Sequence, residues 1–135
     1  MHPTLTGSAT HWIIVLESAF FAVLFLQSAS DKLLNWKDNL GFHQSHFATS
    51  PLARWGRPML LLLTMLELIA GGLSVVALLL QWTNPGSPII LCAFYLPALV
   101  FLCLFFGQRI AKDYAGAAAL VPYFILALFG ILVAG

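Results

Sequence analysis

The sequence predicts an all-α integral membrane protein, a polytopic bundle of four transmembrane helices. Of its 135 residues, 61% are apolar and only 8% are charged, whereas a soluble domain is about 45–50% apolar and about 25% charged. So few charged side chains cannot cover a water-facing surface, which excludes a soluble enzyme or a disordered tail. The formal net charge of +1 provides no field that would attract a nucleic acid.

Four stretches of the chain are apolar for long enough to cross a bilayer. About 20 helical residues span roughly 30 Å of hydrocarbon, and lipid offers the backbone no hydrogen-bond partners, which forces a helix. None of the stretches alternates with the two-residue period of a barrel strand. We expect one membrane domain over residues 1–135, with spans at about 12–30, 59–81, 88–107 and 115–134.

The cationic residues predict how these spans are oriented. They fall in the first and third loops only, as Lys32, Lys37, Arg54, Arg57, Arg109 and Lys112. Cytoplasmic loops are enriched in Lys and Arg. We therefore expect both termini on the non-cytoplasmic side of a membrane, taken to be the bacterial inner membrane. Interfacial tryptophans agree, with Trp12 and Trp82 expected at the outer interface and Trp36 and Trp55 at the inner one.

A cleaved signal peptide is a second interpretation of the first span. Ser28-Ala29-Ser30 after an apolar run is typical of a signal-peptidase site. However, no Lys or Arg precedes the run, Glu17 interrupts it, and Lys32 follows it closely. These features favour a retained span.

The long first loop contains an amphipathic segment at about residues 33–48. Apolar residues and one histidine share a face of this segment when it is helical: Leu33, Trp36, Leu40, His43 and Phe47. Lys37, Asp38 and Gln44 lie elsewhere around the helix. Such a pattern predicts a short helix in the inner membrane interface, weakened by about 1 kcal/mol at Gly41.

Prolines and their neighbours predict where other helices begin or bend. Ser87 is placed to cap the third span, with Pro88 in its first turn. Pro58 is expected to kink the second span or mark its start, and Pro122 to bend the fourth.

Two ionisable residues lie inside the predicted spans, Glu17 and Glu67. A charge at the bilayer centre costs roughly 2.5–3.5 kcal/mol, so each is expected to face protein or to be protonated. Lys32 closes the first span, and its long stem can reach toward Glu67, with Gln27 at a similar depth. One interpretation is a pocket of Gln27, Lys32 and Glu67 that handles a proton or a quinone headgroup; the other is an ion pair that fixes helix packing. For Glu17 we expect a structural role near the interface.

Small residues at helical spacing predict close helix contacts rather than a substrate path. They occur in the second and fourth spans as Gly71, Gly72, Ser74, Ala115, Gly116 and Ala119.

The cysteines and histidines give no strong chemical signal. Cys92 and Cys103 would lie roughly 16 Å apart along one helix, too far for a disulfide, and are expected to be buried. His43 and His46 have the spacing of a helical metal pair, but Asp38 is the nearest carboxylate and no cysteine is near. We expect ordinary interfacial histidines and no metal site.

Three segments resemble the DoxX-like family of small four-helix membrane proteins: residues 25–33 (FLQSASDKL), 66–73 (LELIAGGL) and 108–117 (QRIAKDYAGA). Lys32 and Glu67 match that family's charged positions, and Arg109 the basic residue before its last helix. Gly71 and Gly72 match its glycines. The resemblance implies a four-helix fold and a link to respiratory or sulfur redox chemistry, since some relatives are membrane subunits of a thiosulfate:quinone oxidoreductase.

Two functions follow as expectations. The first is an accessory or structural subunit of a larger membrane redox assembly, with lipid and other subunits or further copies of the chain as partners. The alternative is a quinone-interacting subunit of an oxidoreductase, with quinone the one cofactor considered. No Gly-rich nucleotide motif or paired redox thiols occur in the sequence, so electrons would come from elsewhere. A small transporter is less favoured, because no inverted repeat is visible.

Overall fold

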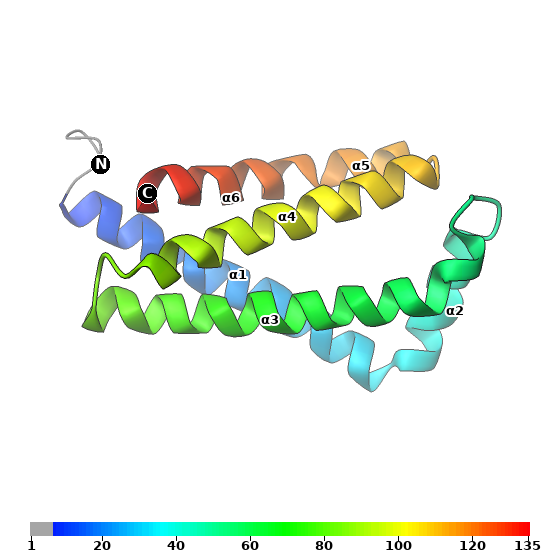
Figure 1. The fold of residues 1–135 in the computed structure, drawn as a ribbon, viewed down its shortest axis with the longest axis horizontal. Coiled ribbons are helices and arrows are strands. Elements are labelled where there is room, and N and C mark those ends of the chain that lie inside the picture. The colour runs from blue at the N-terminus through cyan, green and yellow to red at the C-terminus, as the bar shows by residue number, and fades with distance from the viewer. Residues whose placement is uncertain (1–6) are drawn as a thin grey trace.

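Four long apolar rods run antiparallel in the computed structural model, which describes residues 7–135 (Figure 1). They are formed by α1 (Ser8–Leu34), α3 (Gly56–Thr83), α4 (Pro88–Ile110), and the pair α5 (Tyr114–Ala119) and α6 (Val121–Ala134). The short helix α2 (Trp36–His46) and the 3-10 turn η2 (Ala53–Trp55) lie between the first two rods. Each rod is long and apolar enough to cross a membrane. The expected all-α polytopic fold is confirmed, and the chain is an integral membrane protein.

The helix boundaries follow the capping and proline signals. α1 extends beyond the predicted 12–30 at both ends. α3 starts at Gly56, so Pro58 lies in its first turn, where a missing N–H breaks no helical hydrogen bond. The Ser87 hydroxyl accepts from the backbone N–H of Ile89 and caps α4 as predicted. The fourth rod is interrupted at Leu120, two residues before Pro122.

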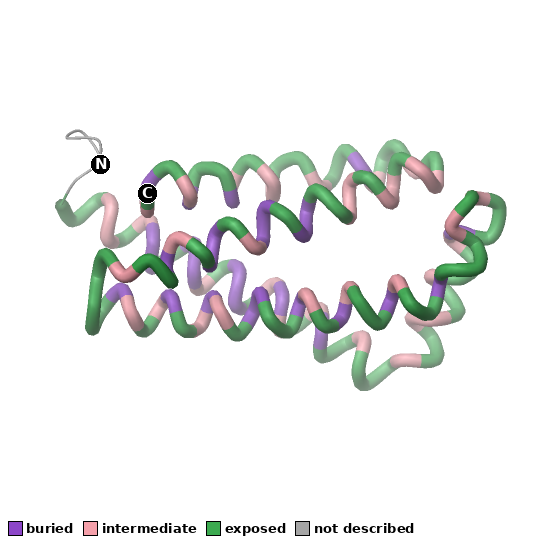
Figure 2. Tube along the Cα trace, in the orientation of Figure 1, coloured by how far each residue is buried: buried purple, intermediate pink, exposed green. Residues whose placement is uncertain are grey.

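Aromatic side chains form the centre of the bundle. The rings of Phe25 and Phe101 stack with centroids 5.4 Å apart, and Phe21 lies 5.9 Å from Phe101. α1 packs along α3, and α4 packs on both α3 and α6. Figure 2 shows buried residues recurring along the sides of these helices that face one another. The rods are held by one aromatic and aliphatic core.

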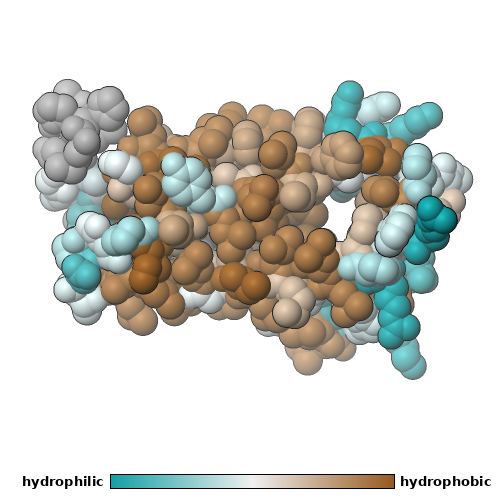
Figure 3. Space-filling model, in the orientation of Figure 1, coloured by the Kyte–Doolittle hydropathy of each residue, from teal (hydrophilic) through white to brown (hydrophobic). Residues whose placement is uncertain are grey.

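The outer surface is apolar around its middle and polar at its ends. Figure 3 shows a broad hydrophobic band between two hydrophilic ends. Large aliphatic side chains stand on this band, among them Leu16, Leu62, Leu79 and Leu99, each at least half exposed. Because water would penalise such a band, lipid is its solvent.

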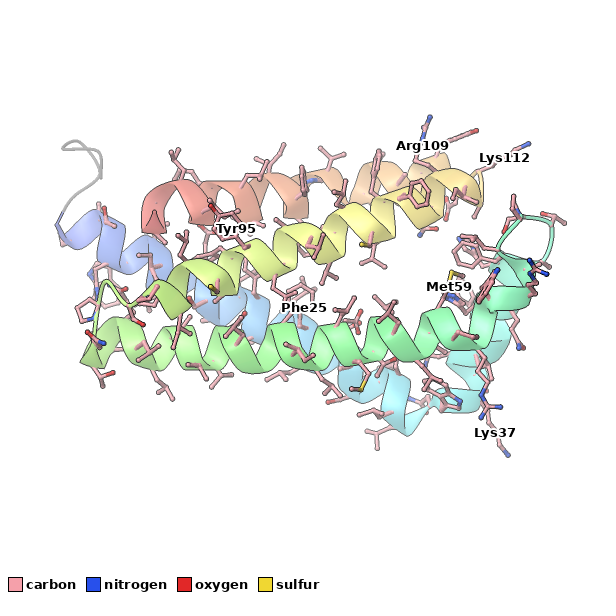
Figure 4. All side chains as sticks on the ribbon, viewed as in Figure 1. Phe25, Lys37, Met59, Tyr95, Arg109 and Lys112 are labelled. Carbon is pink, nitrogen blue, oxygen red and sulfur yellow. The ribbon has the colours of Figure 1, made fainter. Side chains whose placement is uncertain are left out.

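The two ends of the bundle differ in charge. The start of α1 at Ser8 and the C-terminal end of α6 lie at one end, while Lys37, Arg109 and Lys112 project at the other (Figures 1 and 4). We call the second the cation-rich end; it consists of α2, η2 and the connection between α4 and α5. At the opposite end, Trp12 and Trp82 lie with ring centroids 5.6 Å apart.

The amphipathic segment is a helix, but a shorter one than residues 33–48. Leu33 belongs to α1 and is exposed, because the chain turns only at Asn35. Within the expected apolar stripe, Phe47 is buried and Trp36, Leu40 and His43 are half-buried. The polar residues Lys37, Asp38 and Gln44 are exposed, as the pattern indicated.

The small-residue contacts are only partly where the sequence placed them. Gly71 and Ser74 are buried, and the Ser74 hydroxyl donates to the Ala70 carbonyl at 2.9 Å. Gly72 is exposed, because its position is about 100° around the helix from Gly71.

In α5 the small residues that were predicted to make a close helix contact do not lie on the face turned toward the bundle. Ala115 and Ala119 are exposed, and Gly116 is half-buried. The face of α5 turned toward the bundle carries Ala117, which is buried. A helix of only six residues gives too short a pattern to predict from the sequence which of its faces is turned toward the bundle.

The cysteines are free, but the expectation that both are buried is wrong. Cys92 and Cys103 are exposed on the surface of α4. The outward face of a transmembrane helix meets hydrocarbon, so a small apolar thiol needs no protein cover there.

Candidate functional site

A cavity of about 360 Å³ lies at the cation-rich end, between α2, α3 and α4. Figure 3 shows it as an opening between the hydrophobic band and the polar end. Most of its wall is aliphatic, with Leu60, Leu63 and Leu66 from α3 and Val100 and Leu104 from α4. Its polar lining residues are Lys32, Asn39, His43, His46 and Gln108. Small-molecule sites typically combine such a volume of about 300–1,000 Å³ with apolar walls and a few polar groups.

Lys32 joins α1 to α3 beside this cavity. Its Nζ lies 3.3 Å from Oε1 and 3.2 Å from Oε2 of Glu67, and donates to the Ser28 hydroxyl at 2.8 Å. Both partners are shielded, with side chains 15% and 6% exposed for Lys32 and Glu67. The approach of Lys32 to Glu67 that the sequence suggested is therefore present, as an ion pair between helices.

Gln27 does not join this cluster, and Glu67 does not line the cavity. Gln27 is exposed, because five helical residues place it about 140° around α1 from Lys32. Ser28, four residues before Lys32, shares its face and takes the expected place of Gln27. The three residues proposed as a pocket are thus split, and Lys32 alone reaches the cavity.

The turn into α2 is fixed by side-chain hydrogen bonds around Asp31. The Asn35 amide donates to Asp31 Oδ1 at 2.9 Å, and the Asn39 amide donates to the Asn35 carbonyl at 2.9 Å. Asn39 also lies 3.3 Å from Asp31 Oδ2. This bracing sets the phase of α2, so that Asn39, His43 and His46, spaced by four and three residues, all line the cavity.

His43 is the more enclosed of the two histidines. Its ring lies 4.7 Å from that of Phe47, and its Nε2 is buried without a hydrogen-bond partner among residues 7–135. Burial lowers the pKa of His43 from its usual value near 6.5, and the neighbouring His46 and Lys32 lower it further. A neutral imidazole at pH 7 follows.

His46 connects the cavity to the turn between α4 and α5. Its Nε2 lies 2.6 Å from the Gln108 side-chain oxygen and 3.6 Å from Asp113 Oδ2. Asp113 in turn caps α5, accepting from the backbone N–H of Gly116 at 2.8 Å. Beside it, the Arg109 guanidinium lies 4.4 Å above the Tyr114 ring. The carboxylate is thereby held at one position next to His46.

Sequence reasoning did not find the histidines as lining residues. The available signal was the position of His43 on the apolar stripe of α2, where a polar ring is out of place unless it faces a site. Nothing local in the sequence indicated that Gln108, 62 residues after His46, lies across from it. Within residues 7–135 no three His, Cys, Asp or Glu side chains are grouped to hold a metal ion.

Glu17 is a separate polar feature. It is buried, and neither carboxylate oxygen has a hydrogen-bond partner among the described residues. Fifteen helical residues separate it from Lys32, or about 22 Å along α1. It therefore does not belong to the cavity.

Comparison with known proteins adds no assignment. No known protein family, characterised protein or solved structure gave a match to this chain. The likeness to DoxX-like proteins stays an expectation based on three short segments. The geometry of the cavity is therefore the basis for assigning a function to this chain.

Proposed function

We propose that this protein is an accessory membrane subunit of a redox assembly, and that it holds a quinone in the cavity between α2, α3 and α4. One observation carries the proposal: an aliphatic cavity within an integral membrane protein has its polar side chains gathered from α1, α2 and the end of α4. Lipid-soluble ligands need this combination, because their hydrocarbon parts prefer an apolar wall while the polar groups of their heads need hydrogen bonds.

The polar lining suits a quinone headgroup. A quinone ring is flat and carries two carbonyl acceptors, and the lining offers N–H donors on Lys32, Asn39, His43, His46 and Gln108. The leucines of α3 and α4 would contact the ring and the first isoprenoid units.

The lining also suggests how the ligand enters. Leu62 of α3 and Cys103 of α4 line the cavity and are exposed on the outer surface. Both lie on helices whose outer faces meet lipid. A quinone would therefore enter from the bilayer rather than from water. If the Lys and Arg residues face the cytoplasm, as their distribution favours, the site opens in the inner leaflet.

The accessory role follows from the balance of the reaction. Reduction of a quinone to a quinol takes up two electrons and two protons. The cavity lining contains groups that can exchange protons, whereas the two cysteines are separated on α4 and the sequence has no nucleotide-binding motif. A partner subunit is accordingly the electron donor, and this chain binds and positions the quinone.

Labelling of the two natural cysteines tests the quinone site without any substitution in the chain. Cys103 lines the cavity and Cys92 lies on the same helix outside it. In lipid nanodiscs, decylubiquinone or a short-chain menaquinone at ten times its Kd should slow labelling of Cys103 by a lipophilic maleimide about tenfold, by mass action. Labelling of Cys92 should not change. Equal labelling of Cys103 with and without either quinone would refute the site.

Variants identify the residues that bind the headgroup. His46→Leu should raise the Kd for quinone by about five- to tenfold, since one hydrogen bond is worth about 1 kcal/mol. Gln27→Leu and His11→Leu are matched controls, because Gln27 faces outward and His11 hydrogen-bonds Gln81. Weakening of quinone binding by Gln27→Leu as large as that by His46→Leu would contradict the proposed geometry.

The accessory role has its own test. Crosslinking mass spectrometry in native membranes should capture a stable neighbouring redox subunit attached near the cation-rich end, where Lys37 and Lys112 offer exposed amines to the crosslinker. A chain that crosslinks only to itself or to nothing would count against a subunit role.

A further inference from the structure

A carboxylate at the molecular surface contacts a side chain that lines the cavity. Asp113 has a side chain 34% exposed, and its Oδ2 lies 3.6 Å from Nε2 of His46, whose side chain is 21% exposed. His46 itself borders the cavity. The partly exposed Asp113 carboxylate thus lies beside the His46 imidazole, and the imidazole lies beside the cavity. No other acid of residues 7–135 lies within ion-pair distance of a histidine.

We propose that Asp113 and His46 form the route by which protons from the aqueous phase reach a quinone in the cavity. This inference rests on the proposed function and names the proton donor of that site. In the net reaction, the two quinone carbonyls become hydroxyls. The two electrons come from a flavin or iron–sulfur partner subunit, and each of the two protons passes from water through Asp113 and His46 to a carbonyl oxygen.

Imidazole chemistry allows the transfer. A proton taken up at Nε2 from the side of Asp113 makes an imidazolium, which releases the Nδ1 proton and leaves the other neutral tautomer. Before the second proton is taken up, the remaining ring proton moves from Nε2 to Nδ1 by exchange with water, which restores a bare Nε2. Gln108 can serve both tautomers, because its amide accepts from a protonated Nε2 and, turned over, donates to a bare one. The Asp113 carboxylate stabilises the imidazolium and is recharged from water, to which it is partly exposed.

The other charged groups near His46 are less suited to carry protons. Lys32 and Glu67 are paired with each other and shielded from water, so either could lose its charge only by leaving a buried partner uncompensated. Among residues 7–135, no carboxylate lies within ion-pair distance of His43, and the nearby cation Lys32 disfavours a second positive charge there. Arg109 stacks on the ring of Tyr114.

Asp113→Asn separates the proton role from the structural role of this residue. Asn caps a helix about as well as Asp, so its side-chain oxygen can still accept from the Gly116 N–H. The variant removes the ionisable group alone. Asp38→Asn is the matched control, because Asp38 is exposed on α2 and its side chain has no hydrogen bond or ion pair within the described residues.

The experiment uses the full chain in nanodiscs, with decylubiquinone at ten times its Kd for the protection measurement and at less than one molecule per protein for the conversion measurement. Protection of Cys103 measures binding, and stopped-flow absorbance with excess dithionite measures conversion of bound quinone to quinol. Asp113→Asn should leave protection unchanged and slow conversion at least tenfold, since positioned proton donors contribute about 10²–10⁴-fold. Added formate should restore part of the rate. Asp38→Asn should behave as the wild type.

Each contrary outcome identifies what fails. If Cys103 of the wild type is not protected, the quinone site is refuted and the proton route with it. If quinone binds and Asp113→Asn converts it at the wild-type rate, the route alone is overturned. Loss of Cys103 protection in Asp113→Asn would also overturn it, because the carboxylate would then serve binding or folding.

Discussion

Two adjacent glycines of α3 have opposite surroundings. A Cβ on Gly71 would lie 2.7 Å from Cδ2 and 3.2 Å from the backbone nitrogen of Leu26. A Cβ on Gly72 would meet nothing within 4 Å. The first glycine is needed for the close approach of α1, and the second is not.

This difference gives a paired prediction. Gly71→Ala should lower the free energy of unfolding by about 1–3 kcal/mol, the usual effect of overpacking. Gly72→Ala should leave it unchanged or raise it by up to about 1 kcal/mol, because alanine is the better helix former. Unfolding in mixed detergent followed by circular dichroism measures both. Similar losses from the two variants would mean that the α1–α3 contact is misplaced.

His43 makes stability depend on pH. Its pKa in the folded protein is lowered by burial and by the neighbouring His46 and Lys32, while in the unfolded chain it returns to about 6.5. The unfolded state therefore binds more protons in the window below 6.5, so this residue's contribution falls as the solution is acidified through that window. His43→Gln should flatten this part of the stability curve. An unchanged slope of stability against pH in the variant would refute the assignment.

At the scale of whole helices, much of the fold could be predicted because the solvent is lipid. Because hydrocarbon allows only long apolar helices, the four spans could be predicted from the local sequence. The Ser87 cap and the interruption near Pro122 could be predicted from the residues themselves. The side of the helix that faces the bundle was predicted wrongly where the pattern was short, as at Ala115 and Ala119. For Gln27, the prediction considered only depth in the membrane and not the position of the residue around α1. The cavity depends on how α2 folds back on α3 and α4, and this tertiary arrangement cannot be predicted from a local sequence pattern.

The ion pair between Lys32 and Glu67 ties α1 to α3, and a double-mutant cycle tests its role. Lys32→Met should lower the free energy of unfolding by about 3–5 kcal/mol, because it leaves Glu67 buried without its cation. The double variant Lys32→Met/Glu67→Met should recover most of this loss, since no buried charge remains. A double variant as unstable as Lys32→Met alone would show that the lost charge pairing is not the cause.

For the molecule as a whole, the hydrophobic band and the two unlike ends form one consistent arrangement. Hydrophobic side chains cover the middle of the surface (Figure 3), the start of α1 and the end of α6 share one end (Figure 1), and Lys37, Arg109 and Lys112 project from the other (Figure 4). The cavity lies toward the cation-rich end. The direction of the bundle in the membrane therefore decides which leaflet supplies the ligand and which compartment supplies protons.

Topology mapping with single cysteines tests this arrangement most directly. In a chain lacking Cys92 and Cys103, Asn84→Cys and Lys37→Cys place one thiol at each end, at exposed positions. In intact right-side-out cells, a membrane-impermeant maleimide should label the cysteine at position 84 and should reach the one at position 37 only after lysis. Labelling at position 37 in intact cells, or at both positions, would contradict a four-span bundle with its cationic end in the cytoplasm.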